Sequence, residues 1–199
     1  MTSERERMLA GAEYDARDPE LLATAHRARA LLAQYHATPS TDAVRRHALL
    51  TALLTALLGH AGEGIWIEPP FFCDYGVNVS IGAHTFVNTN CVLLDSAEIR
   101  IGANALLGPG VQLLTAYHPL RAADRLPAGW TPESGRARYR TQAAPIAIGD
   151  DCWIGAGTIV MPGVTIGAGT TIGAASLVTR DVPAGVLAFG HPCRVQRTL

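Results

Sequence analysis

The sequence predicts a mainly β protein, a parallel β-helix of six-residue repeats, with an N-terminal helical hairpin and one long excursion loop. Three observations predict it: a six-residue period from about residue 63 onward, a helical pattern before it, and a break in the period at "LTAYHPLRAADR", which begins at Leu114. We expect two units: a helical subdomain over 1–60, and a β-helix domain over 61–199 that carries the loop at 114–145.

The helical pattern covers residues 18–59. Asp18 and Pro19 suit an N-cap followed by Pro at the first helical position. An apolar stripe follows at helical spacing: Leu21, Leu22, Ala25, Ala28, Leu32 and Tyr35. The stretch "ATPST" ends this helix, and a second stripe then precedes Gly59: Leu50, Leu53, Leu54, Leu57 and Leu58. One face of the hairpin should pack on the rest of the chain, because two short helices alone bury too little.

The six-residue period is clearest after residue 148, where six consecutive hexads begin with Ile or Val and carry a small residue or Val at position five. Four upstream hexads obey the same rule, and they begin at Ile81, Val87, Ile101 and Leu107, with a two-residue slip between the Val87 block and the Ile101 block. Each hexad suits a short strand whose aliphatic residue points to the coil axis, while the fifth residue fits a tight corner. Three strands would close a coil of about eighteen residues, and coils would stack at ~4.8 Å.

Composition narrows the class of function. The net charge of −1 argues against nucleic acid or an anionic membrane as a partner. All 16 basic residues are Arg, which excludes a Lys Schiff base or a Lys general base. The charged start "MTSERERMLAGAEYD" is no secretory signal, and the apolar run "LLTALLTALLG" is far shorter than the ~20 residues a membrane span needs. We therefore expect a cytoplasmic protein.

The four cysteines form no CxxC pair and have no His partner at zinc spacing, so we expect no metal. Cys73, Cys91 and Cys152 fall at position five of their hexads, which favours corner packing over a redox or metal role. Cys73 and Cys91 are expected one coil apart and could stack.

Beyond the hexads, six stretches carry a more specific signal: "MLAGAEYDARDPEL", "PPFFCDYGVNVSIG", "FVNTNCVLLD", "GPGVQLLTAYHPL", "IGDDCWIGAG" and "VTRDVPAGVLAFGHPCRV". Together, over about residues 7–197, they resemble the maltose/galactoside O-acetyltransferase group of hexapeptide-repeat acyltransferases. The resemblance implies a left-handed β-helix and a homotrimer with each active site between two subunits. It also implies acetyl transfer from acetyl-CoA to a sugar hydroxyl.

The resemblance assigns catalysis to two residues. His118, in "TAYHP", matches the family's catalytic histidine, and an imidazole is suited to deprotonate a hydroxyl as it attacks a thioester. Asn88, in "FVNTNC", matches an asparagine that hydrogen-bonds at the reacting centre. Asp15, Asp74 and Asp95 match polar positions near the acceptor sugar, whose hydroxyls carboxylates bind well.

The resemblance also places acetyl-CoA on the late coils. The backbone N–H of Ala156 matches a donor to the thioester oxygen. Trp153 and Ala174 match contacts to the pantetheine arm, and Thr179 and Arg180 match a phosphate region. Arg194 and Arg197 match contacts to the nucleotide end.

One stretch departs from the family pattern. The loop after His118 is longer than usual and carries Trp130 and Tyr139, which could stack on a sugar or anchor the loop. The family often has a Glu that orients the histidine, but the corresponding stretch "RYRTQAAPI" has no acid. Glu133 could take this role if the loop folds back.

Three other functions remain open from sequence. The same fold and donor could serve an antibiotic, an amino sugar or a lipo-oligosaccharide as acceptor. A metal site like that of the carbonic anhydrases of this fold would need three converging His, whereas His84 and His118 are those in or near the repeats. A non-catalytic scaffold would need neither His118 nor Asn88, and both are present.

Overall fold

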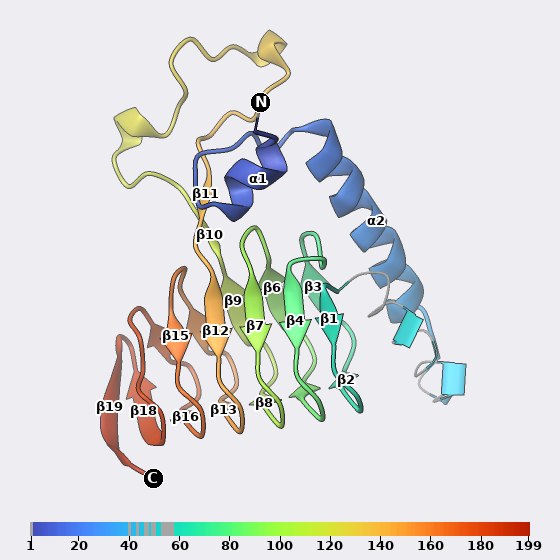
Figure 1. Cartoon of the computed structure of the whole chain (residues 1–199), viewed down its shortest axis with the longest axis vertical. Helices are drawn as coiled ribbons and strands as arrows, with labels where there is room; N and C mark the ends of the chain where they lie inside the picture. Colours follow the sequence, from blue (N-terminus) through green and yellow to red (C-terminus); the bar gives the residue numbers. More distant parts are fainter. Residues whose placement is uncertain (1, 40, 43, 46–47, 49–50, 53–57) are drawn as a thin grey trace.

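The computed structural model describes residues 2–39, 41–42, 44–45, 48, 51–52 and 58–199 (Figure 1). The second predicted helix falls largely outside these residues. The remaining chain forms a β-helix with α1 (Glu4–Leu9) and α2 (Pro19–His36) packed beside it. No helix in the described part is both long and apolar enough to cross a bilayer.

The helix α2 confirms the prediction from its N-cap and stripe. The Asp18 carboxylate accepts hydrogen bonds from the first-turn amides of Glu20 and Leu21, and Pro19 occupies the first position. The buried side is the predicted one: Leu21, Ala25, Ala28, Leu32 and Tyr35. The Tyr35 hydroxyl donates to the carbonyl of Ile67, which fastens the helix to the β-helix.

The helix α1 was not predicted, although the sequence carries its signal. Ser3 accepts from the amide of Glu6, and the Glu6 carboxylate accepts from the amide of Ser3. This reciprocal pair is a capping box, which the spacing Ser-x-x-Glu announces.

The β-helix has three parallel sheets in the described chain, which the chain visits in the order first, second, third. The first sheet contains β1 (His60–Ala61), β4 (Val79–Ile81), β7 (Ile99–Ile101), β12 (Ile146–Ile148) and β15 (Thr165–Ile166). The second contains β2 (Trp66–Ile67), β5 (Phe86–Val87), β8 (Leu106–Leu107), β13 (Trp153–Ile154), β16 (Thr171–Ile172), β18 (Val186–Gly190) and β19 (Cys193–Thr198). The third contains β3 (Phe72–Cys73), β6 (Val92–Leu94), β9 (Gln112–Leu114), β14 (Ile159–Val160) and β17 (Leu177–Val178). β19 pairs antiparallel with β18 and ends the stack.

Aliphatic residues at position one of the hexads fill the coil axis. In the second sheet, Ile67, Val87, Leu107, Ile154 and Ile172 lie in one register and are fully buried. This ladder confirms the expected role of the repeat, because each coil adds one apolar side chain to a continuous core.

The fifth residue of the hexad does more than fit a corner. The Thr85 hydroxyl donates to the carbonyl of Gly102 in the next coil at 2.7 Å. The thiol of Cys152 lies 3.2 Å from the carbonyl of Gly167 in the same way. A small donor at this position therefore links successive coils as well as leaving room for the turn.

The early coils are longer than eighteen residues, in the coil where the hexads slip by two residues and also in the coil before it. Trp66 pairs with Phe86 and Phe86 with Leu106, a spacing of 20 residues, whereas Trp153 pairs with Thr171, a spacing of 18. The two extra residues lie at the corner between the third and first sheets. They shift the register, so that Cys73 pairs with Leu93. The expected stacking of Cys73 on Cys91 was therefore wrong.

The long loop leaves the β-helix at this same third–first corner, after β9, and returns before β12. Its stem is an antiparallel pair, β10 (Ala116–Tyr117) and β11 (Gln142–Ala143). Between them lie two short turns of 3₁₀ helix, η1 (Ala122–Asp124) and η2 (Pro132–Ser134). The loop and α1 lie on the same side of the β-helix, with β11 beside α1 (Figure 1).

The axial ladder should dominate stability. Ile166 points inward from β15 and is fully buried, while its neighbour Thr165 is exposed. We expect Ile166→Ala to lower the free energy of unfolding by about 2–5 kcal/mol, because it leaves a cavity in the ladder. Thr165→Ala should change it by about 0.5 kcal/mol or less. Denaturant melts of both variants check this, and equal effects would contradict the assigned core.

Candidate active site

The residues predicted to lie at the reacting centre and the acceptor are found on two different edges of the β-helix. Asp74, Asp95 and the loop with His118 lie at the third–first corner, where the chain passes from the third sheet to the first. Asn88 and Ala156 follow β5 and β13, at the corner between the second and third sheets. One chain therefore does not bring His118 and Asn88 to the same edge.

His118 follows the stem strand β10 and is exposed. Its Nδ1 lies 2.7 Å from the main-chain carbonyl oxygen of Arg140, at the other side of the stem. A carbonyl oxygen can only accept, so this contact requires the proton on Nδ1 and leaves Nε2 as a free lone pair in the neutral ring. This is the tautomer that a general base needs at Nε2.

The Arg140 carbonyl oxygen makes the contact with the His118 ring that was expected from an acidic side chain. Sequence reasoning considered Glu133, which lies on η2 and is exposed. The contact could not have been found from residue types, because the accepting group is main chain.

Arg125 also holds the two sides of the loop together around His118. Its guanidinium donates to the carbonyl oxygens of Pro119 at 3.0 Å and Leu120 at 2.8 Å. Its own carbonyl accepts from the amide of Arg140 at 2.8 Å. Sequence reasoning did not select Arg125, because surface arginines carry no pattern that marks such a clamp.

A pocket of about 350 Å³ opens beside the histidine, and its lining is His118, Pro119, Leu120, Arg125 and Tyr139. The ring of Tyr139 lies 6.1 Å from the imidazole and is 45% exposed. Trp130 has a different environment: its Nε1 donates to the carbonyl of Arg136 at 3.2 Å. The Arg138 guanidinium lies over both aromatic rings, at 5.6 Å from Trp130 and 5.4 Å from Tyr139.

Asp95 is completely buried at the widened corner. Its Oδ1 accepts from the amides of Asp74 at 3.0 Å and Tyr75 at 2.8 Å, and its Oδ2 from the amide of Asn78 at 3.3 Å. The Asn78 side chain donates back to the Asp95 carbonyl at 2.7 Å. Asp95 thus holds the backbone that carries Asp74, which itself is half-buried.

Burial and, to a smaller extent, the charge of Asp74 raise the pKa of Asp95 to about 6, although the hydrogen bonds from the amides of Tyr75 and Asn78 lower it. Burial also raises the pKa of Asp74, while the Arg29 guanidinium lowers it. The charge of Asp74 thus disfavours ionisation of the neighbouring Asp95 carboxyl.

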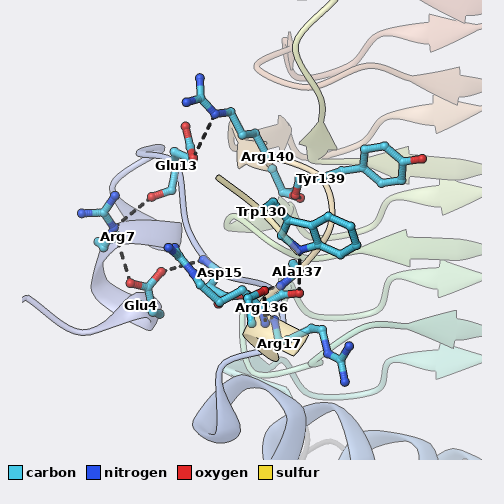
Figure 2. Close-up of polar contacts among 12 residues, drawn as sticks. Glu4, Arg7, Glu13, Asp15, Arg17, Trp130, Arg136, Ala137, Tyr139 and Arg140 are labelled. Atoms are coloured by element: carbon cyan, nitrogen blue, oxygen red, sulfur yellow. Dashed lines mark hydrogen bonds and ion pairs between the residues drawn. The ribbon is translucent and has the colours of Figure 1, made fainter. Parts of the chain in front are cut away.

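Asp15 contacts the long loop. Its Oδ1 accepts from the amides of Ala137 at 2.9 Å and Arg17 at 3.0 Å, and its Oδ2 lies 3.2 Å from Nε of Arg136. Burial alone would raise the pKa of Asp15, but these hydrogen bonds and the Arg136 charge lower it. Figure 2 shows the carboxylate between the two segments.

The residues predicted to bind coenzyme lie along the late coils. Trp153 is 53% exposed, and its row in the second sheet continues through Thr171 and Leu187 to Arg197. Ala156 and Ala174 occupy the same corner in successive coils, where the amide of Ala175 donates to the Ala156 carbonyl at 2.8 Å.

The other predicted residues are also accessible. Thr179 and Arg180 are exposed after β17. Arg194 donates to the carbonyl of Cys193 at 2.8 Å and is exposed. Asn88 is half-buried, and its side-chain oxygen accepts from the amide of Thr89 at 2.8 Å.

No metal-binding constellation is found among the described residues, where three or more His, Cys, Asp or Glu never gather suitably. His84 lies in a turn between the first and second sheets with φ of 58°, at a different corner from His118. The carbonic-anhydrase-like arrangement of three His therefore has no counterpart in the described chain.

Two family models match the chain. The maltose acetyltransferase hexapeptide capping motif matches residues 7–62, and the bacterial transferase hexapeptide model matches residues 145–180. A solved galactoside acetyltransferase in complex with coenzyme A superposes with a TM-score of 0.88 and 31% identity, covering 100% of this chain and 92% of that one. The chain belongs to the maltose/galactoside O-acetyltransferase family.

Two further proteins are similar to the chain over nearly their whole length. A hexapeptide-repeat-containing acetyltransferase of Vibrio cholerae, complexed with acetyl-coenzyme A, has a TM-score of 0.84 and 38% identity, covering 99% and 98% of the two chains. Nodulation protein L of Rhizobium meliloti is 44% identical over 98% of each chain. The protein is thus an acetyltransferase of the hexapeptide-repeat class, as its fold and capping motif also indicate.

The buried carboxylate of Asp95 predicts a pH dependence of stability. Its folded pKa of about 6 exceeds the ordinary aspartate pKa of 3.8, so the folded state keeps the proton to higher pH than the unfolded state does. The protonated Asp95 carboxyl therefore contributes about 3 kcal/mol to the free energy of unfolding below pH ~4. This contribution is lost as the pH rises through ~6. Asn is neutral and has no proton to lose here, so the stability of wild type relative to Asp95→Asn should fall by about 3 kcal/mol between pH 4 and pH 7, as measured by unfolding curves. Parallel pH profiles would contradict the assignment.

Proposed function

We propose that the protein transfers an acetyl group from acetyl-CoA to a hydroxyl of a maltose-, glucose- or galactoside-like sugar, with His118 as the general base. The observation that carries this proposal is the contact of His118 Nδ1 with the Arg140 carbonyl beside an open pocket. It leaves Nε2 available for the hydroxyl proton.

The reaction then follows from the tautomer. Nε2 takes the proton of the acceptor hydroxyl as its oxygen attacks the thioester carbonyl, which gives a tetrahedral intermediate. The backbone N–H of Ala156 would donate to the oxyanion. Collapse of the intermediate breaks the carbon–sulfur bond, and the imidazolium returns its proton to the leaving thiolate, so the base is regenerated.

The donor assignment rests on family members whose structures hold acetyl-coenzyme A or coenzyme A. In this chain the proposed groove follows the row from Trp153 to Arg197 and the corner with Ala156 and Ala174. Arg180, Arg194 and Arg197 would supply charge to the phosphates, as the chain has no Lys.

We propose a homotrimer in which each active site lies between two copies. The two edges that carry His118 and Asn88 support this, because a single chain keeps them apart. Exposed apolar side chains on the flat outer faces, Phe72 at 48% and Leu106 at 42%, also favour burial against another copy. In such an assembly, the His118 edge of one copy would face the Asn88 corner of the next.

On the acceptor side, Asp74 and Tyr139 are the proposed contacts. Asp74 has an accessible carboxylate at the widened corner, and Tyr139 offers a ring face beside the imidazole. Asp95 acts through Asp74, because its oxygens already accept from three amides. Trp130 holds the loop through its contacts with Arg136 and Arg138.

The antibiotic, amino-sugar and lipo-oligosaccharide alternatives differ in the apolar group or charge they carry. Leu120, almost fully exposed at the pocket rim, would suit the apolar portion of such an acceptor, so amino sugars and antibiotic alcohols belong in the acceptor panel. A cytoplasmic location is proposed with the function, because acetyl-CoA is a cytoplasmic metabolite and the four cysteines are unpaired.

The test is thiol release from acetyl-CoA with a panel of maltose, glucose, galactosides, amino sugars and antibiotic alcohols. We expect acceptor-dependent release that His118→Ala lowers by at least ~100-fold, because the variant has no base for the hydroxyl. His26→Ala, on the exposed side of α2, is the matched control and should keep wild-type activity. Unchanged release in His118→Ala would contradict the proposed mechanism.

A further inference from the structure

The N-terminal segment contacts the part of the loop that orients His118. Three consecutive residues face it: Glu13, whose Oε1 lies 3.4 Å from Nε of Arg140, Tyr14, whose amide donates to Thr141 at 3.3 Å, and Asp15. Asp15 accepts from Ala137 and pairs with Arg136. These contacts bracket the Arg140 carbonyl on both sides along the chain (Figure 2).

The segment itself is held firmly by α1. Arg7 Nε donates to the carbonyl of Glu13 at 2.9 Å, and the amide of Asp15 donates to the Glu4 carboxylate at 2.6 Å. The capping box of Ser3 and Glu6 fixes the start of the same helix. Residues 13–15 are therefore a rigid support, although they lie outside the β-helix.

The contacts differ in strength. The Asp15 side chain is only 15% exposed and meets both a main-chain amide and a guanidinium, so it is the stronger attachment. The Glu13–Arg140 pair is more exposed and lacks hydrogen-bond geometry, although Nε of Arg140 is buried. Such an ion pair adds little energy by itself, and its value here is placement of the Arg140 residue.

We propose that Asp15, with Arg136 and Ala137, is a loop anchor that positions the Arg140 carbonyl and so fixes the tautomer and direction of the His118 ring. Asp15 is then a positioning residue for His118, because it acts through the Arg140 carbonyl. The proposal rests on His118 as the base. It gives the N-terminal capping region a role in catalysis, 121 residues away in sequence from Arg136.

The loop-anchor role of Asp15 predicts that changing either Asp15 or its partner Arg136 has the same effect on catalysis. Asp15→Asn keeps an oxygen for the Ala137 amide but turns a second N–H donor toward Arg136. Arg136→Gln removes the guanidinium and leaves Asp15 in place. If Asp15 anchors the loop, each variant should lower kcat roughly 10-fold, and Arg136→Gln should do so with little change in the acceptor KM, since a misplaced base slows the chemical step. The double variant should be no worse than about twofold below either single one, because both remove one contact.

A readout without turnover separates this inference from the proposed function. In protein labelled with ¹⁵N-histidine, with His118 signals assigned from the His118→Ala variant, the neutral ring should be protonated at Nδ1. Asp15→Asn and Arg136→Gln should both shift the population toward the Nε2–H tautomer, and Arg136→Lys should restore part of it. Arg121→Gln, an exposed arginine of the same loop, is the matched control and should leave kcat and tautomer unchanged.

The inference is overturned if Arg136→Gln leaves both kcat and the tautomer as in wild type, or if Asp15→Asn raises only the acceptor KM. Thermal melts of each variant check that the β-helix is intact, and the exposed Arg136 side chain makes its variant the safer one. Failure of His118 as the base would appear separately, as undiminished turnover in His118→Ala.

Discussion

One packing constraint underlies the structure: each six residues must deliver one aliphatic side chain to the axis of the coil. The ladder through Ile67, Val87, Leu107, Ile154 and Ile172 shows the result, a core that grows by one layer per coil. Because the coil is so narrow, only small groups fit its corners, and polar chemistry must lie on the edges or outside. The placement of every candidate site residue follows from this division.

The third–first corner is where the constraint is relaxed. Two additional residues per early coil make room for the buried Asp95 carboxylate, and one coil later the chain leaves altogether as the long loop. The same edge therefore gathers Asp74, His118 and the loop contacts of Asp15. The six-residue period is interrupted where His118 has to project from the β-helix. The paired strands β10 and β11 hold the base of this loop in a fixed position.

Sequence reasoning predicted the β-helix and α2 because their signals are local and repeated: the hexad, the Asp18–Pro19 start and a helical stripe. It detected the two extra residues between the hexads at Val87 and Ile101 but not those in the preceding coil, where the hexad pattern is weaker. It also missed the Arg140 carbonyl that orients His118, because every residue has a carbonyl oxygen and none is marked in the sequence. The contacts of Arg125 were missed because loop contacts follow no repeating sequence pattern. The division of His118 and Asn88 between two edges became visible only with the sheet order.

The central claim is that a complete site takes His118 from one copy and Asn88 from another. The most direct test mixes two inactive variants, His118→Ala and Asn88→Ala, by joint refolding or co-expression, and measures thiol release from acetyl-CoA. If the residues come from different copies, roughly a quarter of wild-type activity should return, because random assembly unites the two intact residues at about one site in four. If both residues of a site belong to one copy, the mixture should stay as inactive as either variant, and the claim would be contradicted.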